Sequence, residues 1–192
     1  DVSGVRGDLD VIDKAITLEG AGAASTRIVA NFPGGAREFD RVLDVHPGAR
    51  LTITGVTISG GSTTGSGGGI RNRGVLEANR IVVSNSTSGG GIYVGTDAQL
   101  TLRDSEIRGN TARQFGGGVF IDFGATATML NTTIADNVAV NANGGGLANQ
   151  GTVTLTNSTI SGNSVNGNGG GIYNASSGTL TARNATITNN TA

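Results

Sequence analysis

The sequence has no cysteine, no tryptophan and only two prolines among its 192 residues. Without cysteine the chain cannot form a disulfide framework or a thiolate metal site. So little proline excludes a collagen-like or polyproline structure. The chain has one histidine, His46, which precedes Pro47 at an expected turn. A lone histidine beside a turn is typical of a structural or exposed residue, so we expect no histidine-based catalytic centre.

A dominant charge and a long apolar run are also missing. The formal net charge is −1, so no overall field attracts nucleic acid or an anionic membrane, and we expect neither as a partner. No apolar run approaches the length that a membrane-spanning helix needs, so we expect no membrane insertion. The chain opens at Asp1 without a charged-then-apolar leader. We therefore expect a segment of a longer or processed protein.

Glycine, in contrast, is abundant, with 34 residues. Threonine, asparagine and serine are also frequent, and hydrophobic residues make up 36% of the chain and recur along its whole length. Branched aliphatic residues at this density argue against disorder. The glycine content and the lack of a 3.6-residue period argue against helices. These observations favour an all-β fold.

Two sequence signals recur with the same period. The first is three glycines followed by an aliphatic residue, and it occurs at Gly67–Ile70, Gly89–Ile92, Gly116–Val119, Gly144–Leu147 and Gly169–Ile172. The second is the segment Asn157–Asn163, with related segments at Asn79–Asn85, Asp104–Asn110, Asn131–Asn137 and Asn184–Asn190. Since both signals keep a period of 22–28 residues, they indicate a repeat architecture rather than biased composition.

Within each repeat, apolar and polar residues alternate with period two, as in Thr152–Thr156. This pattern predicts short strands, separated by turns rich in glycine and asparagine. One such unit cannot bury its own apolar face, so copies must stack as coils about 4.8 Å apart. We predict a single all-β domain over residues 1–192, a single-stranded parallel β-helix (β-solenoid) of about seven coils. Residues 1–41 are less regular, with strand candidates at Leu9–Ile12, Ile16–Leu18 and Thr26–Val29, and residues 42–192 are regular.

Stacking places equivalent residues above one another. One expected column contains the amides Asn79, Asn131, Asn157 and Asn184 together with the carboxylate Asp104, and a second contains Asn85, Asn110, Asn137, Asn163 and Asn190. In such a ladder each side-chain amide donates to the next carbonyl oxygen and satisfies groups inside the coils. The aliphatic between the columns, Val82 or Ile107 for example, should point inward. The coil at Gly74–Asn79 is one residue short, and we expect a slip that points Leu76 inward and keeps the charge of Glu77 outside.

These segments resemble the right-handed parallel β-helix of the pectate-lyase-like superfamily, and the repeat regions of bacterial surface and secreted proteins. The resemblance rests on Gly169–Asn174, Gly178–Thr181 and Asn157–Asn163. It implies a right-handed helix and a location outside the bacterial cell or on its surface. It further implies a non-catalytic rigid stalk, adhesin or assembly element, whose partner is a polysaccharide or another surface protein. One alternative is a protein that binds or degrades polysaccharide with its outer face, and another is a filament subunit that associates end to end.

The residue after each glycine–aliphatic tetrad should point outward. That column contains Arg71, Tyr93, Phe120, Ala148 and Tyr173. Arg71 and the three aromatic residues are therefore candidate ligand-binding residues, because exposed aromatic rings can lie against sugar rings. The alternative interpretation is that the rings stack on each other and shield the strands.

The carboxylates give two further candidates. Asp8, Asp10 and Asp13 form either a Ca²⁺ site, since hard cations need several oxygen ligands, or a solvated acidic face; no other cofactor is expected. Asp104 is either a ladder member or, with Glu106, a pair for glycoside hydrolysis. No cluster of catalytic residue types is present, so we name no catalytic residue, and the question of enzymatic activity stays open.

A column of threonines is expected on one outer face, at Thr52, Thr101, Thr128, Thr154 and Thr181. Flat threonine arrays on β-solenoids can order water and bind ice. The file beside it contains Arg103, Leu130 and Arg183, which interrupt the array. The other interpretation is the ordinary preference of threonine for exposed strands.

Overall fold

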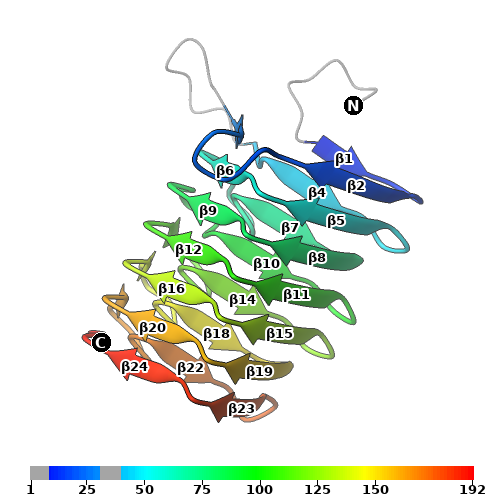
Figure 1. Ribbon diagram of the computed structural model, residues 1–192. Coiled ribbons are helices and arrows are strands. Elements are labelled where there is room, and N and C mark those ends of the chain that lie inside the picture. The colour runs from blue at the N-terminus through cyan, green and yellow to red at the C-terminus, as the bar shows by residue number, and fades with distance from the viewer. Residues whose placement is uncertain (1–8, 31–39) are drawn as a thin grey trace.

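The chain folds as a stack of parallel β-coils. The computed structural model describes residues 9–30 and 40–192, and all 24 regular elements in these residues are strands. The described residues therefore contain no helix that could span a membrane. Three seven-stranded parallel sheets, here called A, B and C, run the length of the stack (Figure 1). Each coil adds one strand to each sheet, so the predicted parallel β-solenoid is confirmed.

Sheet A is built from three-residue strands. They are β1 (Leu9–Val11), β4 (Leu43–Val45), β7 (Ile70–Asn72), β10 (Ile92–Val94), β14 (Val119–Ile121), β18 (Leu147–Asn149) and β22 (Ile172–Asn174). The first and third residues of each strand point inward. The middle residues face outward and lie above one another along the stack.

Sheet B has five-residue strands with a clear period-two burial pattern. They are β2 (Ala15–Glu19), β5 (Arg50–Thr54), β8 (Val75–Asn79), β11 (Gln99–Arg103), β15 (Thr126–Leu130), β19 (Thr152–Thr156) and β23 (Thr179–Arg183). The second and fourth residues point inward. Leu76 is buried and Glu77 is exposed, as expected from the cost of burying an unpaired carboxylate.

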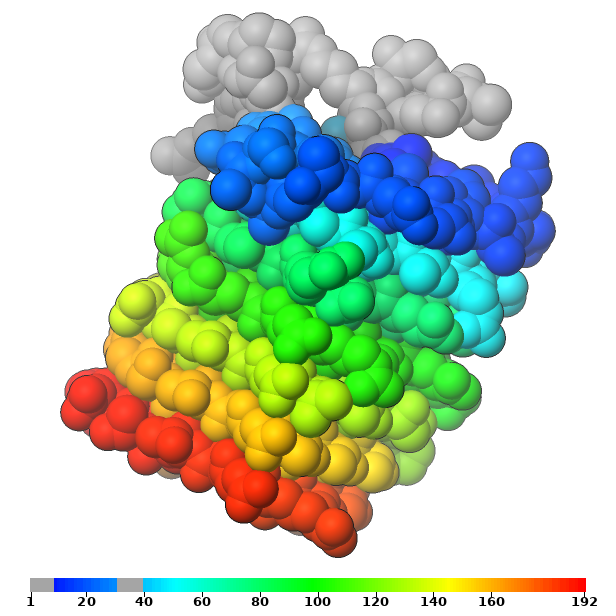
Figure 2. All heavy atoms as spheres, in the orientation of Figure 1, coloured from blue at the N-terminus to red at the C-terminus, as the bar shows by residue number. Residues whose placement is uncertain are grey.

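Sheet C completes each coil, and a small sheet D covers the later corners. Sheet C contains β3 (Arg27–Val29), β6 (Thr57–Ser59), β9 (Val82–Ser84), β12 (Glu106–Arg108), β16 (Thr133–Ala135), β20 (Thr159–Ser161) and β24 (Thr186–Thr188). Sheet D contains β13 (Thr111–Ala112), β17 (Val138–Ala139) and β21 (Ser164–Val165). The strand candidates of the less regular region are confirmed as β1, β2 and β3. In Figure 2 the coils follow one another in chain order down the face of the molecule.

The turn between sheets A and B has two lengths from β4 onward. Most coils use four residues, whereas the coils of β7 and β18 use two. In both short turns the strand ends in a fully buried asparagine, Asn72 or Asn149. Its Oδ1 accepts the backbone N–H of the glycine two residues later, Gly74 at 3.1 Å or Gly151 at 3.0 Å. The hydrogen bond to the asparagine side chain therefore closes the corner with two residues instead of four.

Files of aliphatic side chains fill the interior. In sheet C the inward file contains Ile58, Val83, Ile107, Ile134 and Ile160, all at most 1% exposed. Val83 occupies this file instead of the predicted Val82, because β9 pairs Val83 with both Ile58 and Ile107. Each side chain so buried contributes about 1.5–3 kcal/mol to stability.

A buried asparagine ladder follows sheet C. The Nδ2 atoms of Asn110, Asn137 and Asn163 each donate to Oδ1 of the asparagine in the next coil, at 3.0, 3.0 and 2.9 Å. The same three residues also donate their backbone N–H groups to that oxygen. The second amide proton reaches a carbonyl oxygen of the preceding coil, for example Ile107 O from Asn137. Asn110, Asn137 and Asn163 are completely buried, and such groups must be hydrogen-bonded to remain there.

The glycine triplets explain why the two repeat signals occur together. The third glycine of a triplet faces the ladder: a Cβ atom on Gly118 would lie 2.9 Å from Asn137 Nδ2 and 2.7 Å from Gly146 O. Gly91 and Gly146 approach Asn110 and Asn163 in the same way. The glycine and asparagine signals therefore recur together because these residues contact one another. A residue larger than glycine at the third position of the triplet would displace the ladder.

The predicted ladders need correction in one coil. Strand β8 pairs Asn79 with Arg103, so Arg80, not Asn79, precedes Asp104 in its column. Strand β9 pairs Ser84 with Arg108, which brings Ser86 rather than Asn85 into line with Asn110, and Ser86 N donates to Asn110 Oδ1. Both errors arise from aligning the coil on its asparagines, whereas the aliphatic side chains set its register.

The first predicted amide column lies outside the core. Arg80, Asp104, Asn131, Asn157 and Asn184 occupy the corner between sheets B and C with φ near 50°. These positions favour asparagine because it tolerates the left-handed region. Their side chains are exposed and bond in pairs, Asn131 to Asp104 and Asn184 to Asn157. Only the second column forms a continuous internal ladder.

Candidate functional site

The outward file of sheet A carries most of the chemically distinctive side chains. Its members in chain order are Asp10, Asp44, Arg71, Tyr93, Phe120, Ala148 and Tyr173. The structure thus extends the predicted column Arg71–Tyr173 by two carboxylates at its amino-terminal end. Charge and aromatic character are concentrated in the coils from β1 to β14.

Asp44 is the centre of an ion-pair cluster, although its side chain is only 1% exposed. Its Oδ2 accepts hydrogen bonds from Arg71 Nε at 2.9 Å, from Arg71 Nη2 and from Arg73 Nη2 at 3.1 Å. Burial acts to raise the pKa of Asp44. The hydrogen bond from Arg71 and the charges of Arg71, Arg73 and Arg41 oppose burial, and the net effect lowers the pKa. Asp44 is therefore a buried carboxylate that stays ionised because guanidinium groups surround it.

His46 connects this centre to the first coil. Its Nε2 lies 2.7 Å from Asp10 Oδ1 and 3.5 Å from Asp44 Oδ2. Arg73 Nη2 is 3.3 Å from the other ring nitrogen. The single histidine is thus not isolated at a turn but is held between two carboxylates and a guanidinium.

The predicted Ca²⁺ set of Asp8, Asp10 and Asp13 stays a prediction. Asp8 lies outside the described residues, and Asp13 is an exposed turn residue with φ 50°. Within the described ranges, Asp10 instead groups with Asp44 and His46, whose ligand atoms lie within 4.8 Å of one another. Arg71 and Arg73 already pair with Asp44, and Asp10 contacts His46, so this group fits an ion-pair network better than a divalent cation, which needs uncompensated oxygen ligands.

The aromatic residues shield the sheet more than they offer a binding platform. Phe120 is only 7% exposed, because its ring contacts Tyr93 at 5.5 Å and Phe115 at 5.2 Å between centroids. The small Ala148 separates this cluster from Tyr173. The Tyr93 hydroxyl donates to Asp122 Oδ2 at 2.6 Å, and burial together with this bond raises the pKa of Tyr93 to about 12.

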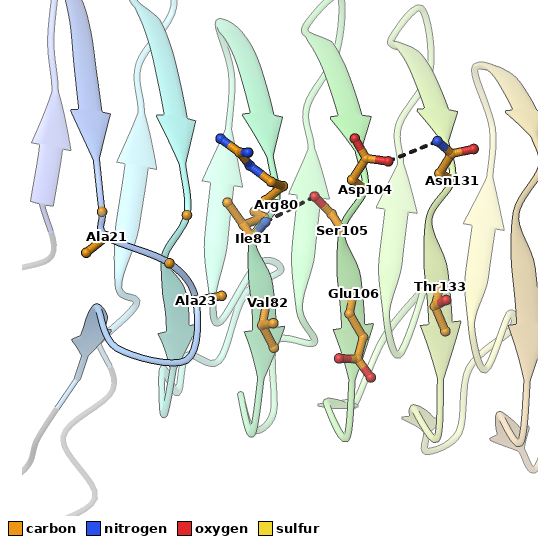
Figure 3. A pocket seen from close by; sticks show the side chains of 13 residues that line it. Ala21, Ala23, Arg80, Ile81, Val82, Asp104, Ser105, Glu106, Asn131 and Thr133 are labelled. Atoms are coloured by element: carbon orange, nitrogen blue, oxygen red, sulfur yellow. Dashed lines mark hydrogen bonds between the residues drawn. The ribbon is translucent and has the colours of Figure 1, made fainter.

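A groove of about 750 Å³ runs along the corner between sheets B and C (Figure 3). In the first coil this corner is a longer loop, and its residues Gly20–Ala23 form one wall of the groove. The loop lies against the next coil at Gly55, where a Cβ atom would be 2.7 Å from Gly20 O. Arg80, Asp104 and Asn131 follow along the corner and supply the polar side chains.

The carboxylates of this groove do not form an acid–base pair. Figure 3 shows the carboxyl groups of Asp104 and Glu106 pointing in opposite directions from the corner. Asp104 accepts a hydrogen bond from Asn131 at 2.9 Å, and Glu106 pairs with Arg108 at 3.2 Å. Glycoside hydrolysis needs two carboxyl groups that flank one bond, and this arrangement does not provide them.

Comparison with protein families gives one match. The model described as "Right handed beta helix region" matches residues 43–192. The chain belongs to the right-handed β-helix family. This assigns the right hand to the stack, in agreement with the resemblance to pectate-lyase-like proteins. No curated protein and no solved structure matches this β-helix.

Sequence reasoning named Arg71 and Tyr93 but missed most of the residues that surround them. Asp44 was one carboxylate among many, and Arg73 and Asp122 lie in turns whose geometry the repeat does not define. One signal was available: Asp10 and Asp44 occupy the same place in the sequences Leu9-Asp-Val11 and Leu43-Asp-Val45. Aligning these two segments would have placed both carboxylates in the Arg71 column.

Proposed function

We propose that this β-helix is a non-catalytic, rigid element of a bacterial surface or secreted protein, acting as a stalk, adhesin or assembly module. The observation that carries the proposal is the uninterrupted register of sheets A, B and C over seven strands each. A stack of this kind is a rod about 30 Å long in which every coil is fixed by its neighbours. The paired carboxylates of both candidate sites support a structural role.

The purified chain should release no product from a broad panel of polysaccharides, measured both as new reducing ends and as unsaturated sugars. Hydrogen exchange on the same sample should show the slowest amides in the strands of all three sheets, as expected for a rod without a mobile lid. Reproducible degradation of any polysaccharide would overturn the non-catalytic role. In the producing cells, external protease should remove the protein from intact cells; full protection would overturn the surface location.

A second function, binding of an acidic or neutral polysaccharide on sheet A, is favoured by one specific observation. Asp44 Oδ1 and Arg73 Nε are buried, and neither has a hydrogen-bond partner within the described residues. Unpaired buried polar atoms are costly, and sugar hydroxyl and carboxylate groups would satisfy both.

Binding to a polysaccharide array with and without Ca²⁺ tests this alternative. If it holds, Arg73→Gln should abolish binding, whereas the matched surface variant Arg108→Gln should bind normally. The double variant Tyr93→Ala and Phe120→Ala examines the aromatic residues separately. A blank array, or equal binding by the Arg73 and Arg108 variants, would reject the site.

A further inference from the structure

The register of sheet B creates a threonine array that the sequence column did not reveal. Strands β15, β19 and β23 pair Thr126 with Thr152 and Thr179, and Thr128 with Thr154 and Thr181. These six residues, here called the threonine array, form two uninterrupted files over three coils. The interrupting Leu130 and Arg183 belong to a third file at the carboxyl ends of the strands.

The array is exposed and has no internal partners. Five of its members are exposed and Thr154 is half-buried. None of the six hydroxyl groups makes a hydrogen bond with the part of the chain that the structure describes, unlike the inward Thr132, which donates to Leu130 O. All six hydroxyl groups are therefore available to an external hydrogen-bonding surface.

The spacing of the array is periodic in two directions. Neighbouring coils lie about 4.8 Å apart, and alternate residues on one strand lie about 6.7 Å apart. The β-branched side chain of threonine has few rotamers, and the strands are held from below by the buried Ala127, Val153 and Leu155. The hydroxyl and methyl groups are thus held in a rigid two-dimensional lattice.

Few charges surround the array: Arg183, at the end of β23, is the only charged residue on its three strands, and Arg103 lies beside Leu130. From residue 137 to the end of the sequence, Arg183 is the only charged side chain. Elsewhere on sheet B, Arg50 pairs with Glu77 and the equivalent files are irregular. A neutral, periodic surface of hydroxyl groups does not suit a charged ligand or a ligand that stacks on aromatic rings. It suits a lattice of ordered water.

We propose that the threonine array binds ice, with three coils of paired hydroxyl files as the contact surface. The array spans only three coils, so its expected effect is inhibition of ice recrystallisation rather than a large separation of freezing and melting points. This proposal is independent of the stalk function, which needs no threonine on sheet B.

Recrystallisation of ice and uptake of the fluorescently labelled chain into growing ice test the proposal. Thr154→Tyr, at the centre of the array, should raise the concentration needed for inhibition by about tenfold or more. Thr52→Tyr is the matched control, because Thr52 occupies the same file between Thr17 and Glu77, outside the array. Leu130→Thr combined with Arg183→Thr extends the array to nine threonines and should strengthen inhibition.

Circular dichroism must show the same β-content and melting behaviour for all four proteins. An inactive natural chain would overturn the proposal whatever the variants do. Equal loss of activity in the Thr154 and Thr52 variants would also overturn it, because the activity would then not reside in the array.

Discussion

The coils that precede β14 and those that follow it achieve the same fold with different chemistry. In the earlier coils the outward file of sheet A contains carboxylates and a guanidinium, and Asp44, Arg71 and Arg73 form buried or half-buried ion pairs. In the later coils nearly every polar side chain is an amide or a hydroxyl, and like residues stack on like, as Asn137 does on Asn163.

The difference follows from the distance between coils. Like charges about 4.8 Å apart repel, so the adjacent carboxylates Asp10 and Asp44 need compensating partners, which His46, Arg71 and Arg73 provide. An amide carries both a donor and an acceptor and can stack on itself without limit. Regular repetition is therefore restricted to neutral polar residues, and the charged coils must be irregular.

The largest expected effect comes from disrupting the buried asparagine ladder of the later coils. Asn137→Ala removes the acceptor of Asn110 N and Nδ2 and the donor to Ile107 O. Three buried polar groups are left without a partner, at about 1–3 kcal/mol each, so the free energy of unfolding should fall by about 3 kcal/mol or more. Urea denaturation measures this. Asn157→Gly, which keeps the positive φ at the exposed corner, should cost less than about 1 kcal/mol, and equal losses would refute the distinction between the two columns.

A smaller loss is expected from the glycine side of the same contact. Gly118→Ala places a methyl group 2.7 Å from Gly146 O and 2.9 Å from Asn137 Nδ2, and should destabilise the fold by about 1–3 kcal/mol. Gly65→Ala is the control, since its Cβ would meet only Thr63 Oγ1 at 3.9 Å. Thermal unfolding of both variants should show a clear decrease for the first alone.

The ion pairs of the earlier coils should make the stability of the fold depend on pH. The pKa of Asp44 is lowered from its usual value of 3.8, so its contribution to stability is complete above about pH 4 and is lost as the pH falls through the folded-state pKa. Asp44→Asn should lower stability at pH 7 and flatten its decline in acid. Glu106→Gln, which removes an exposed pair with Arg108, should change neither. An unchanged acid limb in Asp44→Asn would contradict the ion-pair account.

The smallest effect is expected at Tyr93. Tyr93→Phe removes one hydrogen bond to Asp122 and should cost about 0.5–1.5 kcal/mol at pH 7. Since the pKa of Tyr93 is raised from 10.0 to about 12, the hydroxyl's contribution should disappear as the pH rises from 10 to 12. Titration of the phenolate absorbance checks this, and the transition near pH 12 must be absent in the variant.

Much of the fold was predictable because stacking repeats the same physical requirement in every coil. The period, the strands, the outward Glu77 and the ladder from Asn110 to Asn190 all follow from alternation and repetition. The failures at Asn79, Asn85 and Val82 lie in one coil, where asparagines occur one residue before the positions that the core requires. There the burial of Val83 and Ile81 outweighed the apparent motif.

The candidate site was less predictable, since it depends on residues that do not repeat. Asp44, His46 and Arg73 come together through a four-residue turn and a two-residue turn on adjacent coils. No periodic signal encodes that juxtaposition. The sequence argument also left out the first threonine file, because it compared the middle file with the third file alone.

The asparagine ladder also has a direction. Each buried asparagine offers its backbone N–H and one amide proton to the coil that follows it in the chain, while its other amide proton returns to the coil before. A newly formed coil therefore stays incompletely bonded until its successor arrives. The stack can therefore add coils in chain order, with each new coil completing the hydrogen bonds of the coil before it.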